Sequence, residues 1–301
     1  QFGIERDPKD SFWAQFFKLF ETMPTPAISN DNPINSEYVN HTTNAKNCYL
    51  IFFSGGAAPN EDCSYSYRLD GCKNCLDCSY VLQSENCYEL IDSTRCHAVQ
   101  YGHYVENSFD SAFLFDCKNC SNCFGCVGLR NKKYCIWNEQ YNEETYRRMM
   151  EDLDLGSRKN VARYRSDFKR LIFAKPRRYA NVLKSLNCTG DDIFGSKNCR
   201  SCFFVKDSED SKYIVMAPGG VRDSYDVRSA RGEQVYEGFI ALGGSSKIIN
   251  SAILIANKNV QYSYFMINCS DCFGCVGLRN KQYCALNKQY TKEEYEKAVP
   301  E

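Results

Sequence analysis

Residues 72–81 read CKNCLDCSYV, with cysteine or valine at every third position. The same frame extends from Cys48 to Cys135, where it holds twelve cysteines, and nearly all its other positions carry small or apolar residues. Side chains point inward at every second residue of a strand and about every 3.6 residues of a helix. A spacing of three fits neither element. It predicts triplets in which one inward residue lies between two outward ones.

We therefore predict a mainly β fold: a duplicated β-solenoid, similar to a right-handed β-helix, with an inward cysteine ladder and capping helices. In steps of fifteen, Cys48, Cys63 and Cys78 form one column, and DCSY recurs at 62–65 and 77–80. The expected coil is therefore fifteen residues long, and a coil of twelve also fits the frame. Such a coil has a thin core, which small side chains such as Cys, Ser and Ala can fill.

A longer repeat divides the chain into two halves. Residues 120–135, CSNCFGCVGLRNKKYC, recur at 269–284 as CSDCFGCVGLRNKQYC, an offset of 149 residues. The second half is less regular, and we expect a polar loop insertion at Val221–Gln234, between a frame over 199–217 and another over 236–269. The predicted domains are an N-terminal capping helix and lead-in (1–40), a first solenoid lobe (41–141), a basic helical connector (142–184), a second lobe (185–290) and a C-terminal capping helix (291–301).

Helix signals stand at both ends and between the halves. Asp7-Pro8 is typical of an N-cap followed by the first helical residue, and an apolar stripe follows from Phe12 to Phe20. Thr291 and Glu294 form a capping-box pattern, and Asn142 opens a similar acidic helix start after the first half. Each half is therefore predicted to carry its own C-terminal lid.

Composition excludes several classes of protein. Lys plus Arg and Asp plus Glu both number 37, so the net charge does not favour nucleic-acid or membrane binding by the chain as a whole. No apolar run approaches the length of about eighteen residues that a membrane span needs. No signal peptide is visible, and we expect a cytoplasmic protein. The chain begins with Gln1 and not Met, which predicts a preceding region.

The nineteen cysteines have three interpretations. They are a ladder of buried free thiols acting as small hydrophobes, they form disulfides between neighbouring coils, or some of them bind metal. The odd count and the lack of a signal peptide weigh against disulfides. The metal interpretation rests on a four-cysteine spacing that occurs twice and can hold zinc or an iron–sulfur cluster. Its candidate ligands are Cys120, Cys123, Cys126, Cys135, Cys269, Cys272, Cys275 and Cys284.

A basic segment separates the halves. Beneath its charges, Tyr164, Phe168 and Leu171 lie on a helical apolar stripe. The segment is either a surface for nucleic acid or another acidic partner, or a solvated helix face beside acidic surfaces. The candidate binding residues are Arg158, Lys159, Arg163, Arg165, Lys169, Arg170, Lys175, Arg177 and Arg178.

Catalytic patterns are weak. Three scattered histidines match no triad or metalloprotease motif. Asp207, Asp210, Asp223 and Asp226 could form a carboxylate patch like that of sugar-cleaving solenoid enzymes, although Asp is also common in turns.

The tract from Phe12 through Ser36-Glu37-Tyr38 to Asn47-Cys48-Tyr49-Leu50, with both CFGCVGLRNK copies, resembles a group of cysteine-rich repeat proteins of candidate-phyla (Patescibacteria) bacteria. The resemblance covers nearly the whole chain. Proteins of this group often carry the name CaiB/BaiF family, which implies a coenzyme A transferase. The sequence has no alternating βαβ pattern, so that activity is not expected. The resemblance implies a CxxC zinc ribbon upstream of the shared region and supplies no catalytic residues.

We expect a non-enzymatic binding or scaffold protein that recognises nucleic acid or protein and that can associate with copies of itself through its flat faces. A zinc or iron–sulfur metalloprotein and a carbohydrate-active enzyme are the alternatives.

Overall fold

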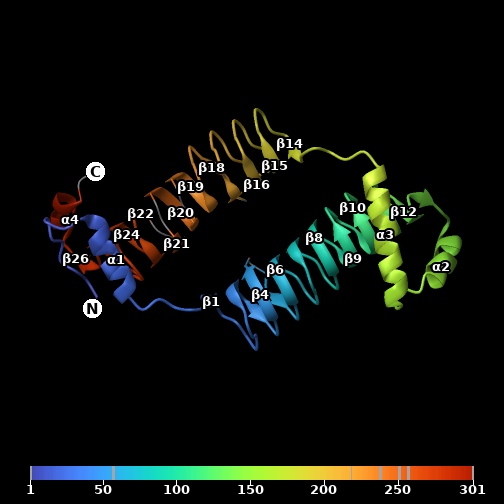
Figure 1. Ribbon diagram of the computed structural model, residues 1–301, viewed down its shortest axis with the longest axis horizontal. Coiled ribbons are helices and arrows are strands. Elements are labelled where there is room, and N and C mark those ends of the chain that lie inside the picture. Colours follow the sequence, from blue (N-terminus) through green and yellow to red (C-terminus); the bar gives the residue numbers. More distant parts are fainter. Residues whose placement is uncertain are drawn as a thin grey trace. The chain divides into compact units, whose positions relative to one another are not determined.

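Parallel β-strands make up most of the protein in the computed structural model, which describes residues 2–55, 58–217, 219–236, 239–249, 252–255 and 258–299. Over residues 229–257 only the backbone is described. Within these ranges the strands form sheets of eleven, thirteen and two strands, and four helices accompany them (Figure 1). The predicted mainly β class is confirmed. No helix in the described ranges is long and apolar enough to cross a membrane.

The chain forms two compact units. The first-half unit comprises Pro26–Arg177, and the second-half unit combines Gln1–Thr25 with Arg178–Glu301. The N-terminal helix therefore groups with the second half of the chain, whereas the sequence analysis grouped it with the lead-in to the first lobe. The ring of Phe12 in this helix lies 5.8 Å from that of Tyr262 and 4.9 Å from that of Phe273, which explains this difference.

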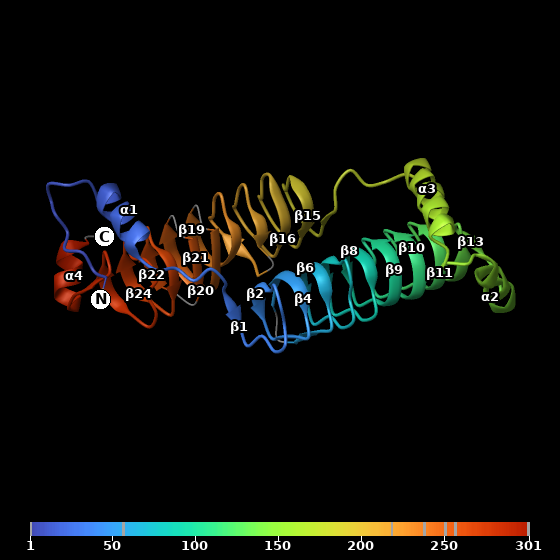
Figure 2. The same ribbon diagram turned by 60° about the horizontal axis from the view of Figure 1, so that its bottom comes forward.

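The strands of the first-half unit follow one another in sequence order (Figure 2). All neighbours in the large sheet pair in parallel except the last two, which form an antiparallel hairpin. This sheet contains β1 (Asn30–Asp31), β2 (Asn40–Thr43), β4 (Tyr49–Ser54), β6 (Ser64–Asp70), β7 (Ser79–Leu82), β8 (Tyr88–Thr94), β9 (His97–His103), β10 (Phe109–Phe115), β11 (Ser121–Val127), β12 (Lys133–Ile136) and β13 (Glu139–Gln140). The small sheet pairs β3 (Ala45–Lys46) with β5 (Asn60–Glu61).

The register between strands corrects the predicted coil length. Tyr67 pairs with Ser79, and Ser79 pairs with Ile91, a step of twelve residues that recurs as far as β12. A step of fifteen occurs once, where Tyr49 pairs with Ser64. A spacing of three divides both numbers, so the cysteine frame alone could not separate them. The extra triplet lies between Ser54 and Asn60, because the register is still twelve at Ser54 and fifteen at Asn60.

The residue just before each inward position commonly has a left-handed backbone conformation. Asn74, Asp77 and Tyr80 precede the inward positions 75, 78 and 81, and their φ angles are 51°, 55° and 56°. The residue before an inward position has a positive φ in nearly every triplet of this unit. Asn and Asp tolerate this conformation better than most residues, which accounts for their frequency just before the frame.

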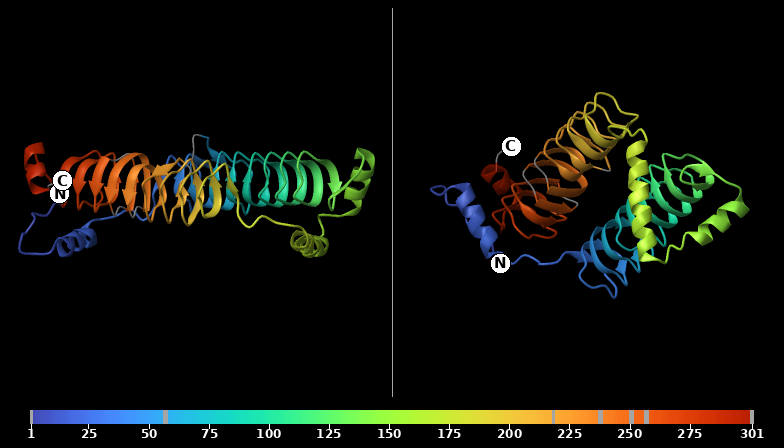
Figure 3. Two further views of the ribbon diagram at one scale, coloured as in Figure 1. Left: turned by 90° about the horizontal axis from the view of Figure 1, so that it is seen from above. Right: turned by 45° about the vertical axis from the view of Figure 1, so that its right-hand side comes forward.

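The strands of the second-half unit also follow one another mostly in sequence order (Figure 3). Their register is less regular. Most steps are again twelve residues, but Val215 pairs with Arg228, thirteen residues on. Its strands are β14 (Val182–Leu183), β15 (Gly190–Phe194), β16 (Cys202–Lys206), β17 (Val215–Ala217), β18 (Val221–Arg222), β19 (Arg228–Tyr236), β20 (Phe239–Ile249), β21 (Ala252–Ile255), β22 (Lys258–Gln261), β23 (Tyr264–Ile267), β24 (Ser270–Phe273), β25 (Gln282–Ala285) and β26 (Lys288–Gln289).

Two predictions for this unit need comment. The expected loop at Val221–Gln234 is wrong, because β18 and β19 occupy most of it, although the register there varies between eleven and thirteen residues. Of the frame over 236–269, the inward positions Val260, Ser263, Met266 and Cys269 are buried as predicted. The side chains of its earlier part lie outside the described residues.

Four helices complete the fold: α1 (Phe12–Thr22), α2 (Glu143–Asp152), α3 (Arg158–Ala174) and α4 (Lys292–Ala298). Asn142 caps α2, and Thr291 with Glu294 forms the predicted capping box of α4. The predicted start of α1 is wrong, since Ser11 is its N-cap and Asp7 instead hydrogen-bonds Gln15. Strand β14 begins at Val182, near the end of the range predicted for the connector.

The duplication is preserved in three dimensions. Asn138 hydrogen-bonds both the N–H and the carbonyl of Val127, at 2.7 and 2.8 Å. Asn287 does the same with Val276, at 2.8 Å for both bonds. The lids are also equivalent: the rings of Tyr134 and Tyr146 lie 5.7 Å apart, and those of their counterparts Tyr283 and Tyr295 lie 5.9 Å apart. Helices α2 and α4 therefore close equivalent ends of the two units.

Candidate functional site

The eight candidate metal-binding cysteines lie inside the two units. Cys123 and Cys135 are direct partners in the β11–β12 register, and Cys272 and Cys284 are the equivalent pair in β24–β25. All eight are at most 2% exposed. Every cysteine of the chain is a free thiol, and eighteen of the nineteen are buried. The cysteines thus lie in the interior of the two units as small, buried free thiols, apart from the half-buried Cys188.

The thiols are hydrogen-bonded to the backbone. Each of the eight sulfurs lies 3.2–3.7 Å from the carbonyl oxygen two residues earlier, to which its S–H donates. Cys126 and Cys275 also approach the carbonyls of Cys135 and Cys284, at 3.5 and 3.4 Å. A carbonyl oxygen favours the protonated thiol and disfavours a thiolate. These contacts suit a neutral core.

Burial and contact between thiols affect their titration. Burial raises the pKa of the Cys96 thiol to about 11. Hydrogen bonding with Cys120, followed by burial, raises the pKa of Cys117. Hydrogen bonds with Cys269, Cys275 and then Cys284 raise the pKa of Cys272. Cys96, Cys117 and Cys272 are therefore protonated near neutral pH and are poor nucleophiles. Hydrogen bonding with a neighbouring thiol has the opposite effect on their partners and lowers the pKa of Cys120, Cys269 and Cys284.

The predicted ligand sets lie close together without forming a recognisable coordination site. In the second copy, the side chain of Cys272 hydrogen-bonds those of Cys269, Cys275 and Cys284. Among the described residues, no group of three or more His, Cys, Asp or Glu side chains is arranged to hold a metal ion. The metal assignment remains a prediction.

The basic segment forms α3, which packs on β10 and β11. Tyr164 and Phe168 are buried there, with ring centroids 5.3 Å from Phe124 and 5.7 Å from Phe113. The predicted apolar stripe therefore attaches the helix to the first-half unit. All nine candidate basic residues are exposed, and eight of them lie in this unit; Arg178 belongs to the second-half unit.

Some of these cations have partners. Arg165 forms an ion pair with Glu89 and lies over the ring of Tyr101, 4.6 Å from its centroid. Arg170 pairs with Asp167. Arg163 and Arg177 lie over the rings of Tyr164 and Phe173, at 5.0 and 4.6 Å. The remaining cations make no ion pair with any described residue: Arg158, Lys159, Lys169, Lys175 and Arg178.

The candidate catalytic aspartates occupy corners of the second-half unit. Asp207, Asp210, Asp223 and Asp226 have φ angles of 48–53° and are exposed. The bridge between Glu209 and Arg222 places Asp210 and Asp223 on the same corner of successive turns. Asp210 accepts a hydrogen bond from Asn198 at 2.7 Å. Their positions are explained by the left-handed backbone, without a catalytic role.

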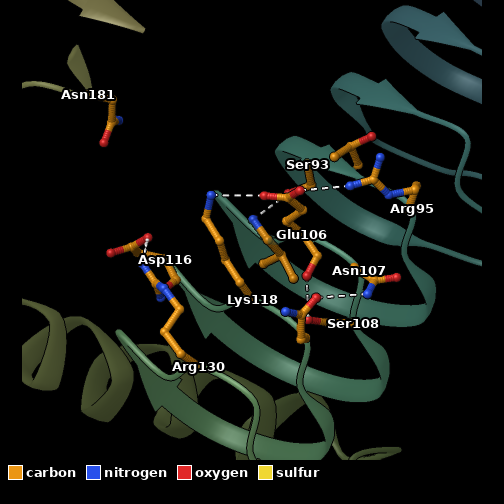
Figure 4. A network of polar contacts seen from close by, with 12 residues as sticks. Ser93, Arg95, Glu106, Asn107, Ser108, Asp116, Lys118, Arg130 and Asn181 are labelled. Atoms are coloured by element: carbon orange, nitrogen blue, oxygen red, sulfur yellow. Dashed lines mark hydrogen bonds and ion pairs between the residues drawn. The ribbon is translucent and has the colours of Figure 1, made fainter. Parts of the chain in front are cut away.

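Polar ladders on the outer surface were missed by the sequence analysis. Glu106 lies between Arg95 and Lys118, at 2.7 and 2.8 Å (Figure 4). The amide of Asn107 donates to Asn119 at 2.8 Å, and that of Asn119 donates to Asn131 at 2.9 Å. The asparagines, and Glu106 and Lys118, are twelve residues apart, so searching the sequence for that period would have found them, whereas Arg95 and Glu106 are eleven apart.

Comparison with known proteins gives little further guidance. No family model and no curated protein matches the chain. Among solved structures, the chain is similar to a putative acetyltransferase from Desulfovibrio desulfuricans G20, with 11% sequence identity and a TM-score of 0.17. That match covers 79% of this chain and 67% of the other chain. At this TM-score, the likeness supports no inference about fold or function.

Proposed function

We propose that the protein is a non-enzymatic scaffold that binds nucleic acid through α3. The observation that carries this proposal is the charge distribution on that helix. Arg158, Lys159, Lys169 and Lys175 are exposed and have no ion-pair partner among the described residues. Unpaired cations of this kind attract phosphates and release the counterions around them.

The bound nucleic acid is proposed to be single-stranded. Phe173, in the last turn of α3, is 61% exposed, and Arg177 lies over its ring. An exposed aromatic ring beside cations is the combination on which unpaired bases stack, whereas the bases of a duplex are not available for stacking. Phe173 is therefore assigned to base stacking and the four unpaired cations to the phosphate backbone.

The scaffold is proposed to be a β-solenoid of the right-handed β-helix type. Three observations support this fold: parallel pairing at a step of twelve residues, an inward residue in every triplet, and helical lids at equivalent ends of the two units. In this arrangement, four triplets make one coil, and the thiols fill its interior. The coils hold α3 rigidly through Tyr164 and Phe168.

Fluorescence anisotropy with a labelled single-stranded oligonucleotide tests the proposal. We expect Arg158→Gln, Lys159→Gln, Lys169→Gln and Lys175→Gln together to weaken binding at least roughly tenfold at low salt. The matched control replaces four exposed cations outside α3, Lys9, Arg148, Lys281 and Lys292, with Gln and should bind within about twofold of wild type. Equal losses in both variants would rule out α3 as the binding surface.

A structural metal is the second candidate function. It is favoured by one observation: Cys272 hydrogen-bonds Cys269, Cys275 and Cys284, the other members of the ligand set predicted from the sequence. Metal binding would require these thiols to lose their protons and their hydrogen bonds to backbone carbonyls. Elemental analysis of purified protein tests it, with about two metal atoms per chain expected for the two cysteine sets and fewer than about 0.2 contradicting it.

A further inference from the structure

Helix α3 covers only part of the face on which it lies. The register aligns one row of residues along the first-half unit at steps of twelve, namely Tyr67, Ser79, Ile91, His103 and Phe115. The residues two positions earlier form a second row, which comprises Tyr65, Asp77, Glu89, Tyr101 and Phe113. Helix α3 contacts the last three members of the second row. Strand β6, which carries the first member, lies further along the stack of strands (Figure 1).

Arg165 of α3 shows what the covered part of this second row binds. Its guanidinium pairs with the carboxylate of Glu89 and lies over the ring of Tyr101, 4.6 Å from the centroid. Glu89 in β8 and Tyr101 in β9 are neighbours across the pairing of those two strands. A guanidinium pairs with carboxylates and also stacks on aromatic rings, so an acid beside an exposed ring is a site for arginine.

The uncovered part of the row contains the same pair of groups. Tyr65 in β6 and Asp77, two residues before β7, are neighbours in the row and line an open hollow of about 350 Å³. The side chain of Tyr65 is 54% exposed. Asp77 is also exposed, and its carboxylate forms no ion pair or hydrogen bond with any residue that the structure describes. Here the acid and the ring are present without an arginine between them.

The lining of the hollow suits one long cationic side chain. Its volume lies near the lower limit of binding pockets, which span about 300–1,000 Å³. The ring of Tyr65 is held in place by edge-on contact with Tyr49, at a centroid distance of 5.5 Å. Leu50 and Phe52 line the hollow as well and can pack against the methylene groups of an arginine. The carboxylate of Asp77 repels phosphate, which distinguishes this hollow from the cations of α3.

We propose that this hollow binds an arginine side chain presented by a basic amphipathic helix of a partner protein. The guanidinium lies between the ring of Tyr65 and the carboxylate of Asp77, as that of Arg165 lies between Tyr101 and Glu89. The exposed side chains of Phe52 and Ile91 receive the apolar stripe of the helix, since the rows of this face already receive the stripe of α3. The partner therefore resembles α3 in its chemistry, and its binding does not depend on nucleic acid.

Fluorescence anisotropy with the full chain tests the proposal, and the probe is a labelled peptide with the sequence of α3, RKNVARYRSDFKRLIFA. We expect the double variant Tyr65→Asn with Asp77→Asn to bind the peptide at least roughly tenfold more weakly than wild type. Asparagine suits both positions, because their φ angles are 50° and 55°. Tyr65→Phe keeps the ring and should bind within about twofold of wild type.

The matched control is Asp110→Asn, which removes another exposed carboxylate with a left-handed backbone, at a φ of 46°, and should leave binding unchanged. A second peptide replaces every arginine with lysine, which keeps the charge but not the planar guanidinium, and should bind at least roughly fivefold more weakly. The proposal is overturned if wild type does not bind the arginine peptide, or if it binds both peptides equally. It is also overturned if the double variant, folded by circular dichroism, loses no more affinity than the control.

Discussion

At the scale of single residues, the interior alternates two kinds of hydrogen bonding. Ser108 donates to the Glu106 carbonyl at 3.0 Å and accepts from the N–H of Cys120 at 3.2 Å. The Cys120 thiol instead donates to the Lys118 carbonyl. Serine can do both because its hydroxyl accepts as well as donates, whereas a thiol is a weak partner in both roles. The sequence predicted small inward residues, but it could not show which of them bond across turns.

The buried thiols make stability depend on alkaline pH. The pKa of Cys96 is raised to about 11 in the folded state, against about 8.5 for a free thiol. A raised folded-state pKa contributes stability that is fully present below the unfolded value and is lost as pH rises through the folded value. We expect chemical denaturation to show a loss of stability between pH 8.5 and 11 that is about 3 kcal/mol smaller in Cys96→Ala than in the wild type. Parallel losses in the two proteins would contradict this.

Gly102 occupies an inward position because its neighbours fill the space. A methyl group there would lie 2.7 Å from Cδ1 of Leu90 and 3.0 Å from Cγ2 of Val105. We expect Gly102→Ala to lower the free energy of unfolding by about 1–3 kcal/mol through overpacking. Shortening the neighbour in Leu90→Val should reduce that cost. A double-mutant cycle by urea denaturation measures the coupling, and strictly additive effects would show that the two residues do not share the space.

At the scale of elements, local signals were more reliable than distant ones. The caps Asn142 and Thr291 were predicted because a cap depends on residues within one turn of the helix. The contact between Phe12 and Phe273 was not predicted, because no local pattern specifies a partner so far along the chain. The expected loop at Val221–Gln234 was wrong for a related reason. Steps of eleven and thirteen residues break the frame in the sequence, but the strands continue through this region.

The asparagine ladder is expected to stabilise the corner that it follows. Asn119 makes side-chain hydrogen bonds with Asn107 and Asn131 and has a φ of 54°. Asn119→Ala should lower the free energy of unfolding by about 1–3 kcal/mol, through lost bonds and the cost of a left-handed alanine. Asn119→Gly removes the bonds and keeps the backbone freedom, so it should cost less. If thermal denaturation shows Asn119→Gly to be less stable than Asn119→Ala, the left-handed backbone does not contribute to the cost of the alanine substitution.

At the scale of the whole molecule, the duplication, the mainly β class and the inward frame were all predictable from the sequence. The coil length was not predictable, because Cys75 and Cys78 both lie in the same every-third-residue frame as Cys63. Only the register separates the two, and it makes Cys75 the neighbour of Cys63 at a step of twelve. The basic residues of α3 were also predicted, but their ion pairs were not, because Arg165 pairs with Glu89, which lies 76 residues away in the sequence.

The most direct test of the account is the salt dependence of binding to single-stranded nucleic acid. Each phosphate contact contributes about −0.7 to the slope of log affinity against log salt concentration. Removing the charges of Arg158, Lys159, Lys169 and Lys175 should therefore make the slope shallower by about 3, while the control variant keeps the wild-type slope. A wild-type affinity that does not fall with rising salt, or equal slopes in wild type and the α3 variant, would contradict the proposal that α3 binds nucleic acid.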